Sequence, residues 1–135
     1  MLFRSIPENK RKFVQSHMND YQNIYIQSES GVKKITSNHI VNLHVKNRKY
    51  ILGQINRAKK LNAKVIVLTH HKPYKSEKTK SEWDSAYESD LSKLFKSPLV
   101  CWCYGHTHVK DDTTINGVRF VSNPKGYPKI GRAHV

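Results

Sequence analysis

The residues best suited to chemistry are histidines that follow two short apolar segments. Thr69-His70-His71 follows residues 65–68, and Gly105-His106-Thr107-His108 follows residues 99–104. Both apolar segments are predicted to be buried strands, and an imidazole at the end of such a strand has no packing reason to emerge there. Histidine is also the commonest metal ligand. The sequence therefore predicts a metal site at the carboxyl ends of the strands.

The second of these loops has a spacing that suits shared ligation. Gly105 allows a sharp turn where the strand ends, and Thr107 separates two imidazoles so that both can reach one metal cluster. A lone histidine is more often packed or hydrogen-bonded than a ligand. We expect structural or surface roles for the isolated histidines His17, His39 and His44.

The elements that must position these loops are read from the spacing of apolar residues. Residues 1–18 show no clear pattern and are taken as an irregular lead-in, whereas residues 20–26 alternate as a half-buried strand does. Apolar residues at spacings of three and four over residues 37–61 predict a long amphipathic helix, in one or two pieces. Residues 65–68 form a continuous apolar run, which predicts a strand buried on both faces.

The second half of the chain is predicted to add a loop, a helix and three strands. Residues 72–83 lack periodicity and should form a surface loop beside the site. Residues 85–95 predict a second helix, and residues 99–104 the next buried strand. Asn116-Gly117 between two short β-prone runs is a strong hairpin signal. The expected fold class is therefore α/β (α+β), with the site at the strand ends.

Composition restricts the class of protein. The 135 residues suffice for one domain, 37% are hydrophobic, and no apolar run approaches the roughly 20 residues of a membrane span. No export signal is visible, so we expect a soluble, cytoplasmic protein that does not enter membranes. Cys101 and Cys103 are two apart on a predicted strand and are interpreted as packing thiols in a reducing compartment.

The chain is strongly basic, with 24 Lys and Arg against 10 Asp and Glu, a formal charge of +14. This charge would attract phosphate esters, nucleotides or nucleic acid. The lysines are spread through every segment, however, which also fits the codon bias of an AT-rich genome. Basic residues within 37–61 are interpreted as the solvated face of the predicted helix.

Together these motifs resemble the calcineurin-like metallophosphoesterases. Thr69-His70-His71-Lys72-Pro73 is similar to one ligand block of that family, and Trp102-Cys103-Tyr104-Gly105-His106-Thr107-His108 to its last histidine block. Shorter matches extend the resemblance over roughly residues 19–128: Asn19-Asp20-Tyr21, Leu43-His44, Ser89-Asp90-Leu91 and Asn123-Pro124-Lys125-Gly126-Tyr127. The resemblance implies that residues 19–129 are the carboxyl-terminal half of a four-layer αββα sandwich.

The resemblance also implies a site and an activity. His70 and His106 would bind one metal ion and His108 its neighbour, the ions being Mn, Fe, Zn or Ni. The two ions would lie about 3.5 to 4 Å apart and would together bind a phosphate mono- or diester. A hydroxide that bridges the ions would attack the phosphorus atom. Residues that would line the substrate or support the ligands are His71, Asn123, Lys125 and Tyr127.

The other ligand blocks of the family are missing. Its Asp-x-His, Gly-Asp and Gly-Asn-His motifs have no counterpart, since Asp20 is followed by Tyr21-Gln22 and Asn38-His39 lacks the glycine. We therefore expect this chain to bind one ion weakly and to lack hydrolytic activity by itself. Half of a two-sheet sandwich should also expose an apolar sheet face and an unpaired edge.

Two other interpretations stay open. The chain could be a non-catalytic nucleic-acid- or partner-binding module that retains the fold, which the net charge favours. It could instead hold a single structural zinc on His70, His106 and His108, although no fourth ligand is evident. Residues 130–135, Ile-Gly-Arg-Ala-His-Val, match the translation of a common sequencing adapter and are interpreted as a non-native tail.

Overall fold

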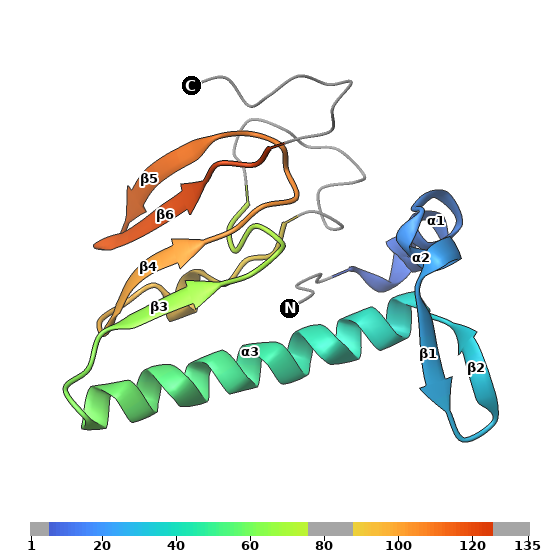
Figure 1. The fold of residues 1–135 in the computed structure, drawn as a ribbon, viewed down its shortest axis with the longest axis horizontal. Helices are drawn as coiled ribbons and strands as arrows, with labels where there is room; N and C mark the ends of the chain where they lie inside the picture. The colour runs from blue at the N-terminus through green and yellow to red at the C-terminus, as the bar shows by residue number, and fades with distance from the viewer. Residues whose placement is uncertain (1–5, 76–87, 126–135) are drawn as a thin grey trace.

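The computed structural model describes residues 6–75 and 88–125, which form a mixed α and β structure with two sheets (Figure 1). The coarse α/β class is thus confirmed. The helices are η1 (Glu8–Lys10), α1 (Arg11–His17), α2 (Asp20–Asn23), α3 (Ser37–Lys60) and η2 (Ser92–Leu94). The strands are β1 (Tyr25–Ser28), β2 (Gly31–Lys34), β3 (Val65–Leu68), β4 (Leu99–Cys103), β5 (Asp111–Ile115) and β6 (Val118–Ser122).

The larger sheet brings the two predicted histidine loops to one edge. Its strand order is β3-β4-β6-β5, with β3 parallel to β4, β4 parallel to β6, and β5 antiparallel to β6. Parallel neighbours end at the same side of a sheet, so the segments after β3 and β4 must leave it together. The backbone N–H of Thr69 donates to the carbonyl of Cys103 at 3.0 Å and continues the ladder beyond the strands.

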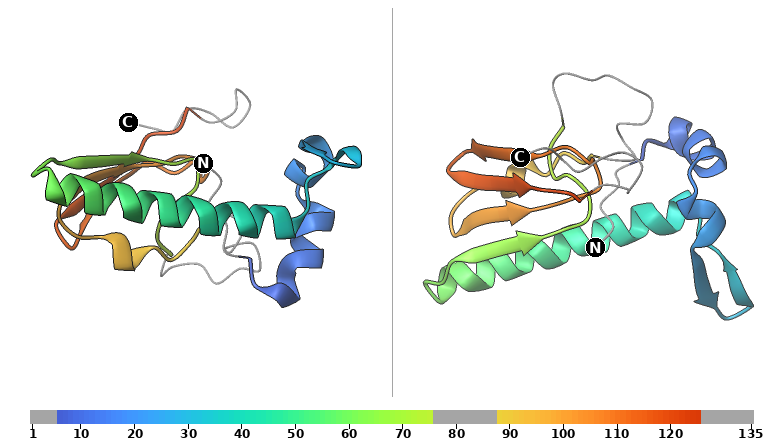
Figure 2. Two further views of the ribbon diagram at one scale, coloured as in Figure 1. Left: turned by 90° about the horizontal axis from the view of Figure 1, so that it is seen from below. Right: turned by 45° about the horizontal axis from the view of Figure 1, so that its top comes forward.

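The main core lies on one face of this sheet, between the strands and α3. Ile51 and Ile55 of α3 pack in one cluster with the fully buried Trp102 and Phe120. The Trp102 and Phe120 rings are stacked, with centroids 6.4 Å apart. Figure 2 shows α3 running beside β3, so the long helix closes this face of the sheet along that side.

The ends of α3 are set by local chemistry that the sequence contains. The Thr36 hydroxyl accepts from the His39 backbone N–H, and the His39 ring accepts from the Thr36 N–H at 3.1 Å. At the other end Asn62 has φ +49°, and the N–H of Ala63 donates to the Ala58 carbonyl at 2.9 Å. The long helix is confirmed as one piece, and His39 has the structural role predicted for it.

The beginning of the chain differs from the prediction. Residues 8–17 are helical rather than irregular, and residues 20–23 are the short helix α2 rather than the start of a strand. Val14, Met18 and Tyr21 are buried together, and their spacings of four and three follow a helical face. The alternation seen over residues 20–26 was too short to separate the two periods, so the strand begins only at Tyr25.

Two further predictions about single elements are wrong. β3 is not buried on both faces, because Val67 is buried while Ile66 and Leu68, which alternate with it, are 61% and 70% exposed. Residues 88–95 do not form the predicted helix, since only the 3-10 turn η2 is helical there, and residues 85–87 lie outside the described part. Glu88 instead pairs with Lys72 in an isolated parallel bridge. The Asp90 carboxylate accepts from the Ser92 backbone and hydroxyl, which starts the single turn η2.

The hairpin and the cysteines follow the predictions. Asn116 and Gly117 both have positive φ, +51° and +77°, as the two-residue turn between β5 and β6 requires. The Cys101 and Cys103 sulfurs lie 3.9 Å apart on one face of β4 and form no disulfide. Among the described residues, no helix is both long and apolar enough to span a bilayer.

Acid should weaken the fold through His44, which is buried on α3. Burial, and then the charge of Arg48, lowers the pKa of His44 from its ordinary 6.5. The folded chain therefore binds this proton less readily than the unfolded chain, and stability is fully present only above pH 6.5. The free energy of unfolding should fall as the pH drops from about 7 to about 5.5.

Urea unfolding at several pH values measures this effect. In His44→Gln, the part of the decrease in the free energy of unfolding that is caused by His44 should disappear. His17→Gln, which replaces an exposed histidine of α1, supplies the matched control for the loss of one imidazole. Equal pH dependence in the original chain and in His44→Gln would assign the effect to other groups.

Candidate metal centre

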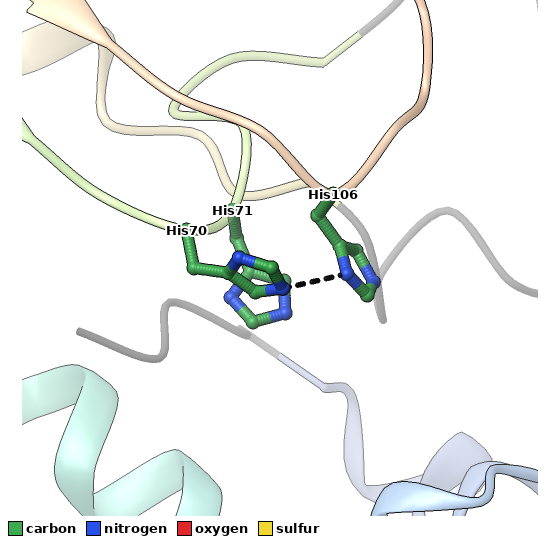
Figure 3. A group of neighbouring side chains, drawn as sticks. All are labelled: His70, His71 and His106. Atoms are coloured by element: carbon green, nitrogen blue, oxygen red, sulfur yellow. Dashed lines mark hydrogen bonds between the residues drawn. The ribbon is translucent and has the colours of Figure 1, made fainter. Parts of the chain in front are cut away.

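Three histidine side chains converge where β3 and β4 end. His70, His71 and His106 each offer one ring nitrogen, and these three atoms lie within 4.8 Å of one another (Figure 3). His71 is fully buried, His106 is half-buried and His70 is exposed. The group is therefore anchored on its inner side and open to solvent on its outer side.

The distances within this cluster suit a shared cation. His106 Nδ1 and His70 Nε2 are 2.9 Å apart, and one of the two rings carries the proton between them. Nitrogens that each lie about 2.0 to 2.1 Å from one ion are themselves roughly 3 Å apart. The ring of His71 lies 4.5 Å from that of His106 and 4.9 Å from that of His70, between centroids. Three imidazoles can thus hold one ion with small adjustments.

Hydrogen bonds from the strands fix the two loops that carry these rings. The Gly105 N–H donates to the carbonyl of His70 at 3.0 Å, which joins one loop to the other. The indole N–H of Trp102 donates to the Thr69 hydroxyl at 2.9 Å, and that hydroxyl donates to the His71 carbonyl at 2.8 Å. Thr69 therefore connects the buried core to the turn that presents His70 and His71.

The turn after β4 is made differently from the prediction. His106 and His108 adopt left-handed backbone conformations with φ +67° and +54°, whereas Gly105 is not among the described residues of positive φ. A Cβ on Gly105 would meet only the His70 carbonyl at 3.8 Å, an ordinary contact. Non-glycine residues with positive φ are uncommon and cluster at functional sites. The strained positions of this loop are thus the histidines themselves.

The structure brings together some of the predicted site residues and leaves others apart. The rings of His70 and His106 lie together, and His71, expected only to line the site, lies with them as a third candidate ligand. His108 is exposed and does not join this group. Asn123 and Lys125 are exposed beyond β6, and Tyr127 lies outside the described residues. In the described ranges, no carboxylate or thiol completes the cluster.

The sequence analysis missed a polar cluster beside the histidines. The hydroxyls of Tyr74 and Tyr104 both donate to Oδ2 of Asp111, and Thr113 donates to Oδ1 at 2.6 Å. Burial, and then the hydrogen bonds with Asp111 and Tyr74, raise the pKa of the Tyr104 phenol far above its ordinary value. The available signal was an aspartate that directly follows the histidine loop, but nothing in its local spacing indicates the distant tyrosine.

Comparison with known proteins gives one similar sequence. The chain is 29% identical over 137 residues to the uncharacterized protein L509 of Acanthamoeba polyphaga mimivirus. The match covers 93% of the chain and 48% of the viral protein, so the chain spans about half the length of this relative. No known family model and no solved structure matches the chain.

Proposed function

We propose that this chain is part of a metal-dependent phosphoesterase of the calcineurin-like type. The observation that carries the proposal is the convergence of His70, His71 and His106 from two loops at the ends of adjacent parallel strands. Histidines rarely gather by chance within ligand distance of one another. Both loops carry motifs that resemble ligand blocks of that family, Thr-His-His-x-Pro and Gly-His-Thr-His.

The donor set fits one ion and not two. Three neutral imidazoles suit Mn, Fe, Zn or Ni, and a bound ion would polarise a phosphate oxygen and acidify a bound water. A second ion needs further ligands, above all a bridging carboxylate, and the described cluster contains none. We propose that the remaining ligands come from sequence beyond this chain, and that the chain alone binds one ion without hydrolysing phosphate esters.

An exposed sheet face supports the four-layer sandwich. Ile66 and Leu68 point away from the α3 side of the sheet and are largely exposed, and β3 is an edge strand in the described residues. An apolar face and an open edge were expected of half a two-sheet sandwich. A second sheet packed on this side would bury both.

Metal analysis and a phosphodiesterase assay test this proposal. The purified chain should bind about one equivalent of Co²⁺ or Mn²⁺ per molecule, while bis(4-nitrophenyl) phosphate should remain intact. A longer reading frame that encodes Asp-x-His, Gly-Asp and Gly-Asn-His upstream should restore hydrolysis. A chain that binds no metal, or a complete longer frame without those motifs, would overturn the proposal.

A second function is favoured by the outer side of α3. The helix contains no aspartate or glutamate, and Lys46, Lys49, Arg57 and Lys60 recur along one side of it. All four are exposed and lie opposite the buried Ile51 and Ile55. Exposed helices usually mix charges in pairs three or four residues apart. This unmixed basic stripe spans about 21 Å and suits the phosphate backbone of duplex nucleic acid.

Neutralising this stripe should reduce binding to a duplex oligonucleotide. The quadruple variant Lys46→Gln, Lys49→Gln, Arg57→Gln and Lys60→Gln should lower the magnitude of the slope of log affinity against log salt by about 3 to 4. Fluorescence anisotropy over a salt series measures it. The control removes four dispersed exposed charges, at Lys12, Lys33, Lys93 and Lys96. Equal loss in both variants would contradict a site on α3.

A further inference from the structure

One carboxylate joins both histidine-bearing loops. Asp111 Oδ2 accepts from the hydroxyl of Tyr104, two residues before His106, and from that of Tyr74, three residues after His71. The two tyrosine oxygens are 3.4 Å apart, and the rings meet edge to face with centroids 6.1 Å apart.

The hydrogen bond between Tyr104 and Asp111 joins the two ends of the loop that carries His106. Asp111 is the first residue of β5, and Tyr104 directly follows β4, so their hydrogen bond spans the neck of loop 105–110. That loop carries His106 with its left-handed backbone. A strained loop keeps its conformation only when its surroundings hold it, and the Tyr104–Asp111 bond does so at the base.

Tyr74 connects Asp111 to the other histidine loop, the segment that follows His71. Its ring packs on Phe120 of the core at 5.1 Å, and the Lys72 ammonium lies 4.3 Å from the ring centre. Lys72 in turn pairs with the buried Glu88 at 3.6 Å. The Tyr74 ring thereby holds the segment after His71 against the core, and the Tyr74 hydroxyl is held by Asp111.

The carboxylate of Asp111 is in its charged form at neutral pH. Burial alone would raise its pKa, but bonds from Thr113, Tyr104 and Tyr74, together with the charge of Lys72, lower it overall. An ionised acceptor makes shorter and stronger hydrogen bonds than a neutral one. Both tyrosine bonds therefore depend on the charge of a single residue.

We propose that Asp111 is a positioning residue that sets the mutual geometry of His70, His71 and His106 by holding both loops through Tyr74 and Tyr104. This inference rests on the proposed metal-binding function. Asp111 lies outside the ligand group and acts through the loops that carry the ligands. Groups that hydrogen-bond metal ligands directly change the affinity typically 10- to 100-fold, which sets the scale expected for Asp111.

Asp111→Asn tests the inference, and the neighbouring residue supplies a matched control. Asparagine keeps the size of the side chain and removes its charge, which weakens both phenol bonds. The Asp112 carboxylate belongs to the same strand but faces solvent, where Arg119 binds it at 2.8 Å. Co²⁺ titration of the 135-residue chain should show about 10- to 100-fold weaker binding and an altered visible spectrum in Asp111→Asn. Asp112→Asn should match the original chain in both.

A metal-free measurement separates this inference from the proposed function. The side-chain ¹⁵N–¹H correlations of the three histidine rings should shift in Asp111→Asn and stay unchanged in Asp112→Asn. If Asp111→Asn does not fold, Tyr104→Phe removes the closing hydroxyl alone and takes its place. Absence of Co²⁺ binding by the original chain would defeat the metal site, whereas unchanged ring signals in the Asp111 variant would overturn the positioning role.

Discussion

Replacing His106 with alanine should weaken Co²⁺ binding by on the order of 100-fold or more. The expected effect exceeds that of a supporting residue, because His106 contributes one of three ring nitrogens grouped within 4.8 Å. Its Nδ1 lies 2.9 Å from His70 Nε2, so its loss leaves two histidines and removes the contact that joins the loops. Isothermal titration with Co²⁺ measures the affinity, and circular dichroism confirms that the variant is folded.

His108→Ala is the sharpest control for this experiment. The sequence resemblance assigns His108 as a ligand, but the structure leaves it exposed and outside the group. It shares the loop and its left-handed backbone with His106, so both substitutions disturb the same segment. Binding within about threefold of the original is expected for His108→Ala, well below the loss typical of a supporting residue. Equal losses in both variants would contradict the His70, His71 and His106 set.

The sequence predicts the part of the site that depends on where strands end, and it does not predict the part that depends on backbone angles or on distant residues. Two apolar runs that end in histidines place His70 and His106 at the carboxyl ends of strands, and the parallel pairing of β3 with β4 then brings them together. The choice between His71 and His108 depends on backbone conformation. The left-handed φ of His106 and His108 directs their side chains, and no residue pattern specifies those angles. Asp111 was missed because Tyr74, 37 residues away, completes its environment.

The fold shows the same division between local and distant causes. α3 and the Asn116-Gly117 hairpin follow from caps, spacing and turn chemistry that lie within each segment. The apolar spacing of residues 88–95 fits a helix as well as that of α3 does. A contact outside the segment decides the outcome, because Glu88 pairs with the distant Lys72. Short apolar runs also say nothing of strand order, so the exposed outer face of β3 could be anticipated only through the family resemblance.

Replacing Trp102 with alanine should lower the free energy of unfolding by about 3 to 5 kcal/mol. The side chain is fully buried, stacked with Phe120 and in edge contact with Phe95, so its removal leaves a cavity that these rings cannot easily fill. The change also leaves the Thr69 hydroxyl without the indole donor. Urea denaturation measures the difference, with Leu68→Ala as control on the exposed face, where about 0.5 kcal/mol or less is expected.

Trp102→Phe separates packing from the hydrogen bond. Phenylalanine retains most of the ring volume but cannot donate to Thr69, whose own bond to the His71 carbonyl sets the turn. This variant should keep more stability than Trp102→Ala and still bind Co²⁺ less tightly than the original chain, because His71 is less firmly placed. Unchanged Co²⁺ affinity would show that the core stabilises the sheet without positioning the histidines, and Asp111 would then be left as their main support.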